Sequence, residues 1–386
     1  MPPAEAGSAA AAPAAASRGD ARDWRFVVAS AIGMLLFGLL LRYVAHLHTG
    51  GQPGLAAYAV ALCRWDCLWY VDIATGGYDP HPNNEGQAAW AFFPMLPLLL
   101  GLAQRLSGLT GPLAGMGLGA FAIGAAAVAS WPLFAGDRRA YLVATVLLLA
   151  GPGAVYFTTG YSESLFVLFT VLAFVALQRS DYAAAGLATA CLSATRLVGI
   201  VMVIVIVLHA VLAARRAGCR WRDVPAALLG DGRLFFGVAL APLGLFAYMA
   251  FLYLTVGDAL AFMRAQEAWG RYLDWPWLQL WEGLTSSFLA YVIWSISAVV
   301  GLLLAALLLA RRRTTEGLFC GLGLVIPLSS GVISMPRFIA GQFPFYLLLA
   351  QAASRRGWHA ILAGLTGVAL GYLSALGWLS DVSYLT

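Results

Sequence analysis

The sequence predicts an all-α polytopic membrane protein, and three observations support this fold class. Of its 386 residues, 61% are hydrophobic and only 11% are charged, whereas a soluble domain carries about 25% charged residues. The mean hydropathy is +0.81. Apolar segments long enough to cross a bilayer recur along the chain between short polar connections. We therefore expect a bundle of about eleven transmembrane helices, since about 20 apolar residues make one crossing.

The N-terminal region divides into a tail and a first transmembrane helix. Residues 1–23 are rich in Ala, Pro, Gly and Ser and are predicted to form a disordered cytoplasmic tail. The apolar segment near residues 25–46 is long enough to span, and no cleavage site indicates that it is removed. Residues 24–386 then form a single transmembrane domain, whose first extracytoplasmic loop covers about residues 47–110.

Arginine clusters predict the orientation of the remaining segments. The chain has 23 basic residues against 18 acidic ones and no lysine. The clusters fall at alternate connections, and the positive-inside rule places these in the cytoplasm if the first helix runs outward. The basic balance is therefore an orientation signal and not a nucleic-acid patch. The clusters are Arg138 with Arg139, Arg179, the group from Arg215 to Arg222, residues 311–313, and Arg355 with Arg356. The predicted spans lie near residues 112–135, 139–157, 165–178, 182–195, 197–214, 233–255, 286–310, 316–333, 338–353 and 359–378.

Residues 92–107 need a separate interpretation, because they are apolar but short and contain Pro94 and Pro97. If they crossed the membrane completely, Arg138 and Arg139 would lie outside, against the charge bias. We therefore predict an interfacial or re-entrant helix on the outer face, which leaves the C-terminus outside.

This topology brings several distant stretches to the outer face, where we expect one site. They are the loop 64–97, residues 161–164, the turn at Arg196 and residues 335–338. The connection 256–285 lands on the same side, and its tryptophans favour the headgroup region.

Asp66 is the candidate general base. If residues 62–73 form a short helix, Asp66, Trp69 and Tyr70 share one face of it. A carboxylate beside aromatic rings at a membrane surface suits a base whose pKa is tuned by partial desolvation. The alternative is a capping or solvated acid on an interfacial helix, and spacing alone leaves both open.

Glu163 and two arginines are further candidates. An ionisable residue near the hydrocarbon suggests a function, although an acid that opens a helix also suits the positive end of the helix dipole. Arg196 and Arg337 lie at outer turns against the charge bias, so either guanidinium could hold a lipid phosphate. Snorkelling to the headgroups is the alternative.

Metal and cysteine chemistry gain little support. The five cysteines and five histidines fit no zinc spacing. Cys63 and Cys67, placed on one helix, are interpreted as small apolar residues and not as a disulfide. The sequence indicates no certain cofactor, and a divalent metal is possible if Asp66, Asp79 and Glu163 converge.

Several short motifs resemble the PIG-V-type mannosyltransferases, a eukaryotic family with bacterial relatives that adds the second mannose of glycosylphosphatidylinositol anchors. In the first loop these are Trp65-Asp66, Ile73-Ala74, Gly77-Tyr78, and Phe92-Phe93-Pro94 with Pro97. Residues 160–166, GYSESLF, resemble the family's G-Y-S-E-[AS]-L-F stretch. Thr195-Arg196 with Gly199 matches its R-x-N-G region only partly, because Val198 stands where Asn is usual. Arg337-Phe338, ahead of Pro344, resembles its C-terminal R-F/Y segment.

The resemblance implies a glycosyltransferase C-like fold and an enzyme that uses polyprenyl-phosphate sugars on the outer or luminal face of a membrane. The lysine-free composition indicates a bacterial protein, so we expect it in the plasma membrane with its site on the extracytoplasmic side. The resemblance also implies Asp66 as the base of an inverting transfer of a hexose, most simply mannose. The acceptor would be a lipid, glycan or protein hydroxyl. Membrane lipids are expected partners and nucleic acid is not. The predicted substrate-binding residues are Arg64, Trp69, Tyr70, Asp79, Tyr161, Glu163, Arg196 and Arg337.

A transporter or flippase of lipid-linked glycans is the alternative function. Such proteins often have inverted repeats and broken helices near the bilayer midplane. Here the acids cluster in one outer loop and no internal repeat is evident, which favours an enzyme.

Overall fold

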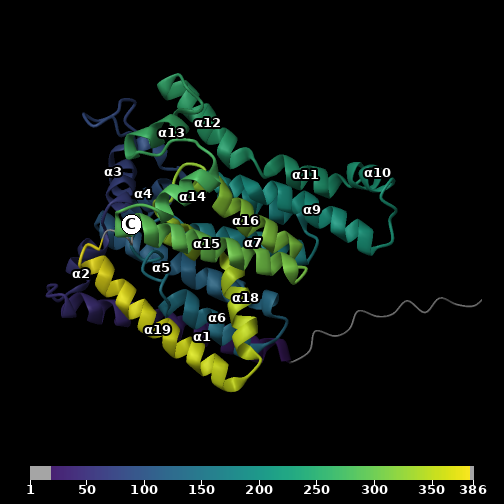
Figure 1. The fold of residues 1–386 in the computed structure, drawn as a ribbon, viewed down its shortest axis with the longest axis horizontal. Coiled ribbons are helices and arrows are strands. Elements are labelled where there is room, and N and C mark those ends of the chain that lie inside the picture. Colours follow the sequence, from purple (N-terminus) through teal and green to yellow (C-terminus); the bar gives the residue numbers. More distant parts are fainter. Residues whose placement is uncertain (1–18, 383–386) are drawn as a thin grey trace, which may run out of the picture.

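The computed structural model describes residues 19–382, and all regular elements in that part of the chain are helices packed into one bundle (Figure 1). Residues 1–18 of the predicted tail lie outside the described residues, and α1 already begins at Gly19. The longer helices are α1 (Gly19–His48), α4 (Met95–Ser107), α5 (Gly111–Ala129), α6 (Arg138–Ala150), α7 (Glu163–Gln178), α8 (Tyr182–Thr195), α9 (Val201–Arg216), α12 (Leu243–Val256), α15 (Leu289–Ala310), α16 (Thr314–Leu328), α18 (Phe343–Ser354) and α19 (Gly357–Leu379). The shorter α-helices are α2 (Leu55–Leu62), α3 (Asp66–Gly76), α10 (Val224–Leu229), α11 (Gly232–Leu240), α13 (Ala261–Arg264), α14 (Pro276–Leu284) and α17 (Met335–Ala340). The 3-10 helices are η1 (Ala89–Ala91), η2 (Trp131–Phe134), η3 (Leu197–Ile200) and η4 (Ala265–Trp269).

Six helical segments between residues 19 and 382 are long and apolar enough to cross a membrane, which confirms the predicted all-α membrane fold. Eleven crossings and the re-entrant placement of residues 92–107 stay predictions. Several apolar helices, α4 among them, are shorter than the roughly 20 residues of a full crossing. The six segments are Asp23–His48, Gly111–Ala129, Leu197–Arg216, Gly232–Val256, Leu289–Ala310 and Gly357–Leu379.

The connections between helices lie at two opposite ends of the bundle, and the arginine-rich ones share one end. Arg138, at the start of α6, forms an ion pair with Asp23 near the start of α1. Arg216 and Arg313, from two other arginine clusters, line one small cavity together. The helices α3 and α13 lie at the opposite end from α10 (Figure 1). The alternation of arginine-rich and arginine-poor connections along the sequence thus corresponds to two separate ends in space.

The first loop contains a break that corrects one prediction. α2 ends at Leu62 and α3 begins at Asp66, and between them Trp65 has a positive φ of 46°. Cys63 and Cys67 form a disulfide, with their Cα atoms 5.1 Å apart. The interpretation of the two cysteines as unbonded apolar residues is therefore wrong. It assumed one continuous helix, whereas the break turns the cysteine before α3 toward the cysteine in its first turn.

Candidate functional site

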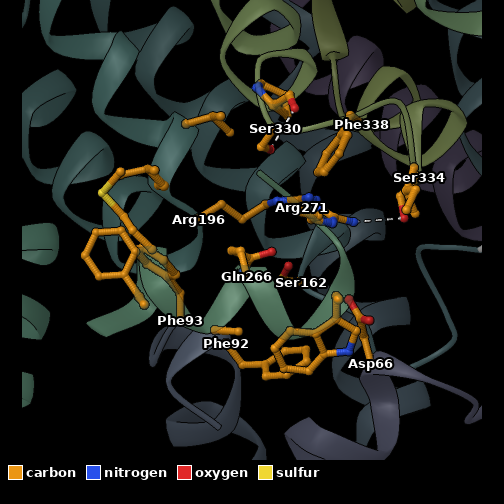
Figure 2. Close-up of a pocket in the computed structure, with 18 of the residues that line it drawn as sticks. Asp66, Phe92, Phe93, Ser162, Arg196, Gln266, Arg271, Ser330, Ser334 and Phe338 are labelled. Atoms are coloured by element: carbon orange, nitrogen blue, oxygen red, sulfur yellow. Dashed lines mark hydrogen bonds between the residues drawn. The ribbon is translucent and has the colours of Figure 1, made fainter. Parts of the chain in front are cut away.

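The stretches predicted to share the outer face line one pocket of about 880 Å³ (Figure 2). Its walls come from α3, the loop before α4, the residues just before α7, the turn after α8, α13 with η4, the end of α16, and α17. Asp66, Trp69 and Tyr70 all line it, as their positions on one helix predicted. Tyr161, Arg196 and Arg337 line it as well.

Two carboxylates and two guanidinium groups form an ion-pair network beside this pocket. Arg337 Nη1 donates to Asp66 Oδ2 at 2.6 Å, and Arg337 Nε lies 2.9 Å from Glu163 Oε1. Arg196 Nη1 pairs with the same Glu163 oxygen. The Glu163 side chain is only 1% exposed, whereas that of Asp66 is 29% exposed. Because an unpaired buried charge is costly, each member of the network depends on the others.

Local backbone features bring these residues together. Glu163 lies in the first turn of α7. Gly160 (φ 75°), three residues earlier, packs so closely against Cys67 that a Cβ at this position would lie 2.7 Å from Cys67 Sγ. Arg196 ends α8 in an extended conformation before η3. Gly199 permits this sharp turn, because a Cβ there would lie 2.4 Å from the Leu192 carbonyl oxygen. Only a glycine fits either close approach.

Three aromatic rings form one wall of the pocket. Trp69 stacks on Phe92 with ring centroids 5.4 Å apart, and Trp269 meets both rings edge-on at 5.8 and 5.9 Å. Trp69 was predicted as a substrate contact, while Trp269 was noted only as part of a Trp-rich connection. The wall offers flat apolar surface next to Asp66, which also lines the pocket.

Arg271 lines the pocket too, although the sequence motifs did not single it out. Its Nη2 donates to Ser334 Oγ at 3.4 Å, and its guanidinium lies 5.9 Å from the Phe338 ring centroid. Figure 2 shows Arg196 and Arg271 beside the Phe338 ring. Burial, with the neighbouring Arg337, lowers the pKa of Arg271 to about 10, which still leaves it protonated at neutral pH. The sequence feature that could have identified it is its position, since Arg271, like Arg196 and Arg337, is an arginine on the predicted outer face, where the charge bias disfavours arginine.

Three predicted residues do not line the pocket. Arg64 pairs with Asp381 at 3.1 Å and donates to the Leu379 carbonyl at 3.0 Å, so it ties the first loop to the end of α19. Asp79 is exposed and accepts a hydrogen bond from the His81 backbone N–H at 2.9 Å. Glu163 lies behind the two arginines and does not belong to the lining.

The pocket's donor set does not fit a divalent metal. Within residues 19–382 no cluster of three or more His, Cys, Asp or Glu side chains could hold one. Asp66 and Glu163 both face guanidinium groups, whose positive charge opposes a second cation at the same oxygens. Asp79 does not join them.

Comparison with known proteins shows the fold. The sequence matches no family model and no curated protein. An oligosaccharyltransferase structure from the archaeon Archaeoglobus fulgidus, in complex with Zn and sulfate, has a TM-score of 0.51 and 14% identity over 91% of this chain and 53% of that one. A structure of the oligosaccharyltransferase AglB from the same organism, with an inhibitory peptide and a dolichol-phosphate, has a TM-score of 0.47 and 13% identity over 91% and 56%. This chain thus spans about half the length of both. The first likeness confirms the predicted all-α membrane fold, which this chain shares with the helical part of that oligosaccharyltransferase.

Proposed function

We propose that this protein is an inverting glycosyltransferase that moves a hexose, most simply mannose, from polyprenyl phosphate to an acceptor hydroxyl. The observation that carries the proposal is the pocket itself, in which a carboxylate, several arginines and an aromatic wall converge at one end of a membrane bundle. The motif resemblance to PIG-V-type mannosyltransferases supports the donor class. The fold likeness to an oligosaccharyltransferase supports sugar transfer only by analogy.

Asp66 is the proposed base. Its Oδ2 atom accepts from Arg337, while Oδ1 accepts no hydrogen bond from the described residues. Oδ1 would take the proton of the acceptor hydroxyl as that oxygen bonds to the anomeric carbon. The bond from this carbon to the phosphate oxygen breaks, and the polyprenyl phosphate leaves with the electron pair. Attack opposite the leaving group inverts the anomeric configuration.

Arg337 couples the proton transfer to Asp66 with the departure of the phosphate. Before the reaction it neutralises Asp66, and once Asp66 carries the proton that ion pair weakens. The negative charge appears at the same time on the leaving phosphate. A guanidinium released from one carboxylate can then stabilise the new charge through the local electrostatics of a partly desolvated site. Glu163 would keep Arg337 in place during this exchange.

The pocket also offers separate surfaces for sugar and lipid. The aromatic wall of Trp69, Phe92 and Trp269 suits the apolar C–H face of a hexose. Leu197 and Ile326, which belong to η3 and α16, provide apolar lining for the first isoprene units. A polyprenyl chain can reach such a groove from the bilayer.

We place the transfer on the extracytoplasmic face of a bacterial plasma membrane. One observation supports this side of the membrane, and a second favours sugar transfer over transport. The Cys63–Cys67 disulfide lies next to Asp66, and disulfides persist mainly outside the cytoplasm. The pocket is lined by stretches that the topology places on one face, whereas a transporter needs a path between both faces.

Sugar transfer in membranes tests the proposal directly. Membranes with wild-type protein and with Asp66→Asn, at matched expression, would receive radiolabelled polyprenyl-phosphate mannose. We expect a labelled product from wild type and a loss of at least about a hundredfold in the variant, since a general base contributes 10²–10⁴-fold. Undiminished transfer in the variant would remove Asp66 from the mechanism. No transfer by wild type to any lipid or protein present would contradict the donor assignment.

A further inference from the structure

The charges beside the pocket do not balance, and the excess is on one residue. The carboxylates of Asp66 and Glu163 are matched by Arg337 and Arg196. Arg271, in contrast, forms no salt bridge within residues 19–382. The network of Asp66, Glu163, Arg196, Arg271 and Arg337 therefore carries one net positive charge.

Two further charged residues line the pocket and do not change this balance. Arg264 forms an ion pair with Asp258, so its charge is already matched. Glu267 is an exposed residue of η4 and is not paired with Arg271. Because exposed charges are screened by water and salt, Glu267 compensates Arg271 only weakly.

Arg271 is held in place while most of its donors stay free. It makes one side-chain hydrogen bond, to Ser334 Oγ, and contacts the Phe338 ring. A guanidinium has several N–H donors arranged in a planar fork, so the others can bind the oxygens of a phosphate. Ser330 and Ser334 both line the pocket (Figure 2). Ser334 Oγ accepts from Arg271 and keeps its own O–H for a ligand, whereas the Ser330 hydroxyl donates to the Pro327 carbonyl oxygen at 2.9 Å. Burial makes the uncompensated charge unfavourable, which its lowered pKa reflects.

We propose that Arg271 is the primary binding residue for the phosphate of the lipid-linked donor, in place of Arg196 or Arg337. This inference rests on the proposed function and deepens it. A sugar phosphodiester carries a single negative charge, which matches the single unpaired cation. Arg196 and Arg337 are occupied by carboxylates in the absence of substrate, so their principal task is to hold the network around Asp66.

A binding experiment separates Arg271 from the remaining arginines. Purified protein in phosphatidylcholine nanodiscs would be titrated with a short-chain polyprenyl phosphate and with the corresponding polyprenol, which lacks the phosphate. We expect wild type to prefer the phosphate, and Arg271→Gln to lose about ten- to a hundredfold in affinity for it while binding polyprenol unchanged. Arg271→Lys should recover part of the loss. Arg105→Gln, at an exposed arginine of α4 outside the pocket, is the matched control and should bind like wild type.

The outcomes distinguish this inference from the proposed function. If wild type prefers the phosphate and Arg271→Gln keeps that preference, Arg271 is not the phosphate-binding residue, while the donor class stands. If wild type itself does not distinguish phosphate from alcohol, the proposed donor and this inference both fail. Equal competition by phosphatidylglycerol or inorganic phosphate would overturn the lipid-linked donor as the occupant. Unchanged thermal unfolding of Arg271→Gln would show that a lost preference does not come from misfolding.

Discussion

At the scale of single residues, Glu163 shows how the site depends on buried charge. One of its carboxylate oxygens faces Arg196 and Arg337 at once, and the side chain is almost fully buried. Its position in the sequence is compatible with a capping acid or a substrate contact. In the structure Glu163, the first residue of α7, pairs with Arg196 at the end of α8 and with Arg337 of α17. Its position fits a residue that positions the two arginines.

We therefore predict that Glu163→Gln is strongly destabilising. Two guanidinium groups would lose the charge that compensates their burial, and breaking a buried pair costs about 3–5 kcal/mol. Thermal and denaturant unfolding in detergent would measure the loss. Asp79→Asn, at an exposed acid, is the control and should stay within about 0.5 kcal/mol of wild type.

A double-mutant cycle of Glu163→Gln and Arg196→Gln measures the contribution of this one pair to stability. If Glu163 and Arg196 act as a pair, the double variant should lose less stability than the sum of the two single losses. Strict additivity would mean that the contact between them contributes nothing to the fold.

At the scale of elements, the break between α2 and α3 determines where Asp66 lies. The disulfide joins the residue after α2 to the first turn of α3, and Asp66 is enclosed in the short ring that it closes. The Tyr161 hydroxyl donates to the Arg64 carbonyl at 3.2 Å, which fixes the same segment against the start of α7. These contacts position the carboxylate, and none of them involves Arg271.

Removing the disulfide should therefore affect the chemical step more than lipid binding. For Cys63→Ala/Cys67→Ala we expect kcat for sugar transfer to fall about ten- to a hundredfold with little change in KM for the donor, since a displaced catalytic group costs that much. Stability should fall by about 2 kcal/mol, the loop-closure contribution of so short a ring. Cys191→Ala, at a free cysteine in α8, is the control. An unchanged kcat would show that the disulfide does not position Asp66.

At the scale of the whole molecule, the two ends of the bundle carry different chemistry. Arginine clusters gather at one end and the pocket lies at the other. Cys219, a partly exposed free cysteine after α9, lies within the predicted cytoplasmic connection at Arg215–Arg222.

Cys219 is thus a native reporter of orientation. A membrane-impermeant maleimide should leave it unlabelled in intact spheroplasts and label it after permeabilisation. Asp79→Cys, on the exposed first loop, should be labelled without permeabilisation. The reverse pattern would place the pocket in the cytoplasm and contradict the proposed use of an extracytoplasmic donor.

Much of the site could be predicted from the sequence because its residues violate local rules. Asp66, Arg196 and Arg337 stand out as ionisable groups among apolar segments on the face where arginine is rare, and all three line the pocket. Arg271 is also an arginine on that face, but the neighbouring tryptophans of the 256–285 connection indicated an interfacial segment and not a site residue. Asp79 and Arg64 satisfied the pattern as well, yet one is exposed and the other is tied to α19.

The sequence by itself determined the helical membrane fold and the alternation of arginine-rich and arginine-poor connections, because hydropathy and charge bias act locally along the chain. Its short motifs named Asp66 as the candidate base through their resemblance to a known family. Only the tertiary structure decided which charges neutralise each other. Residues 66, 163, 196, 271 and 337 are far apart in sequence, and their pairing depends on how the helices pack. That packing leaves Arg271 as the unmatched cation, and a balance among five distant residues cannot be read from any local pattern.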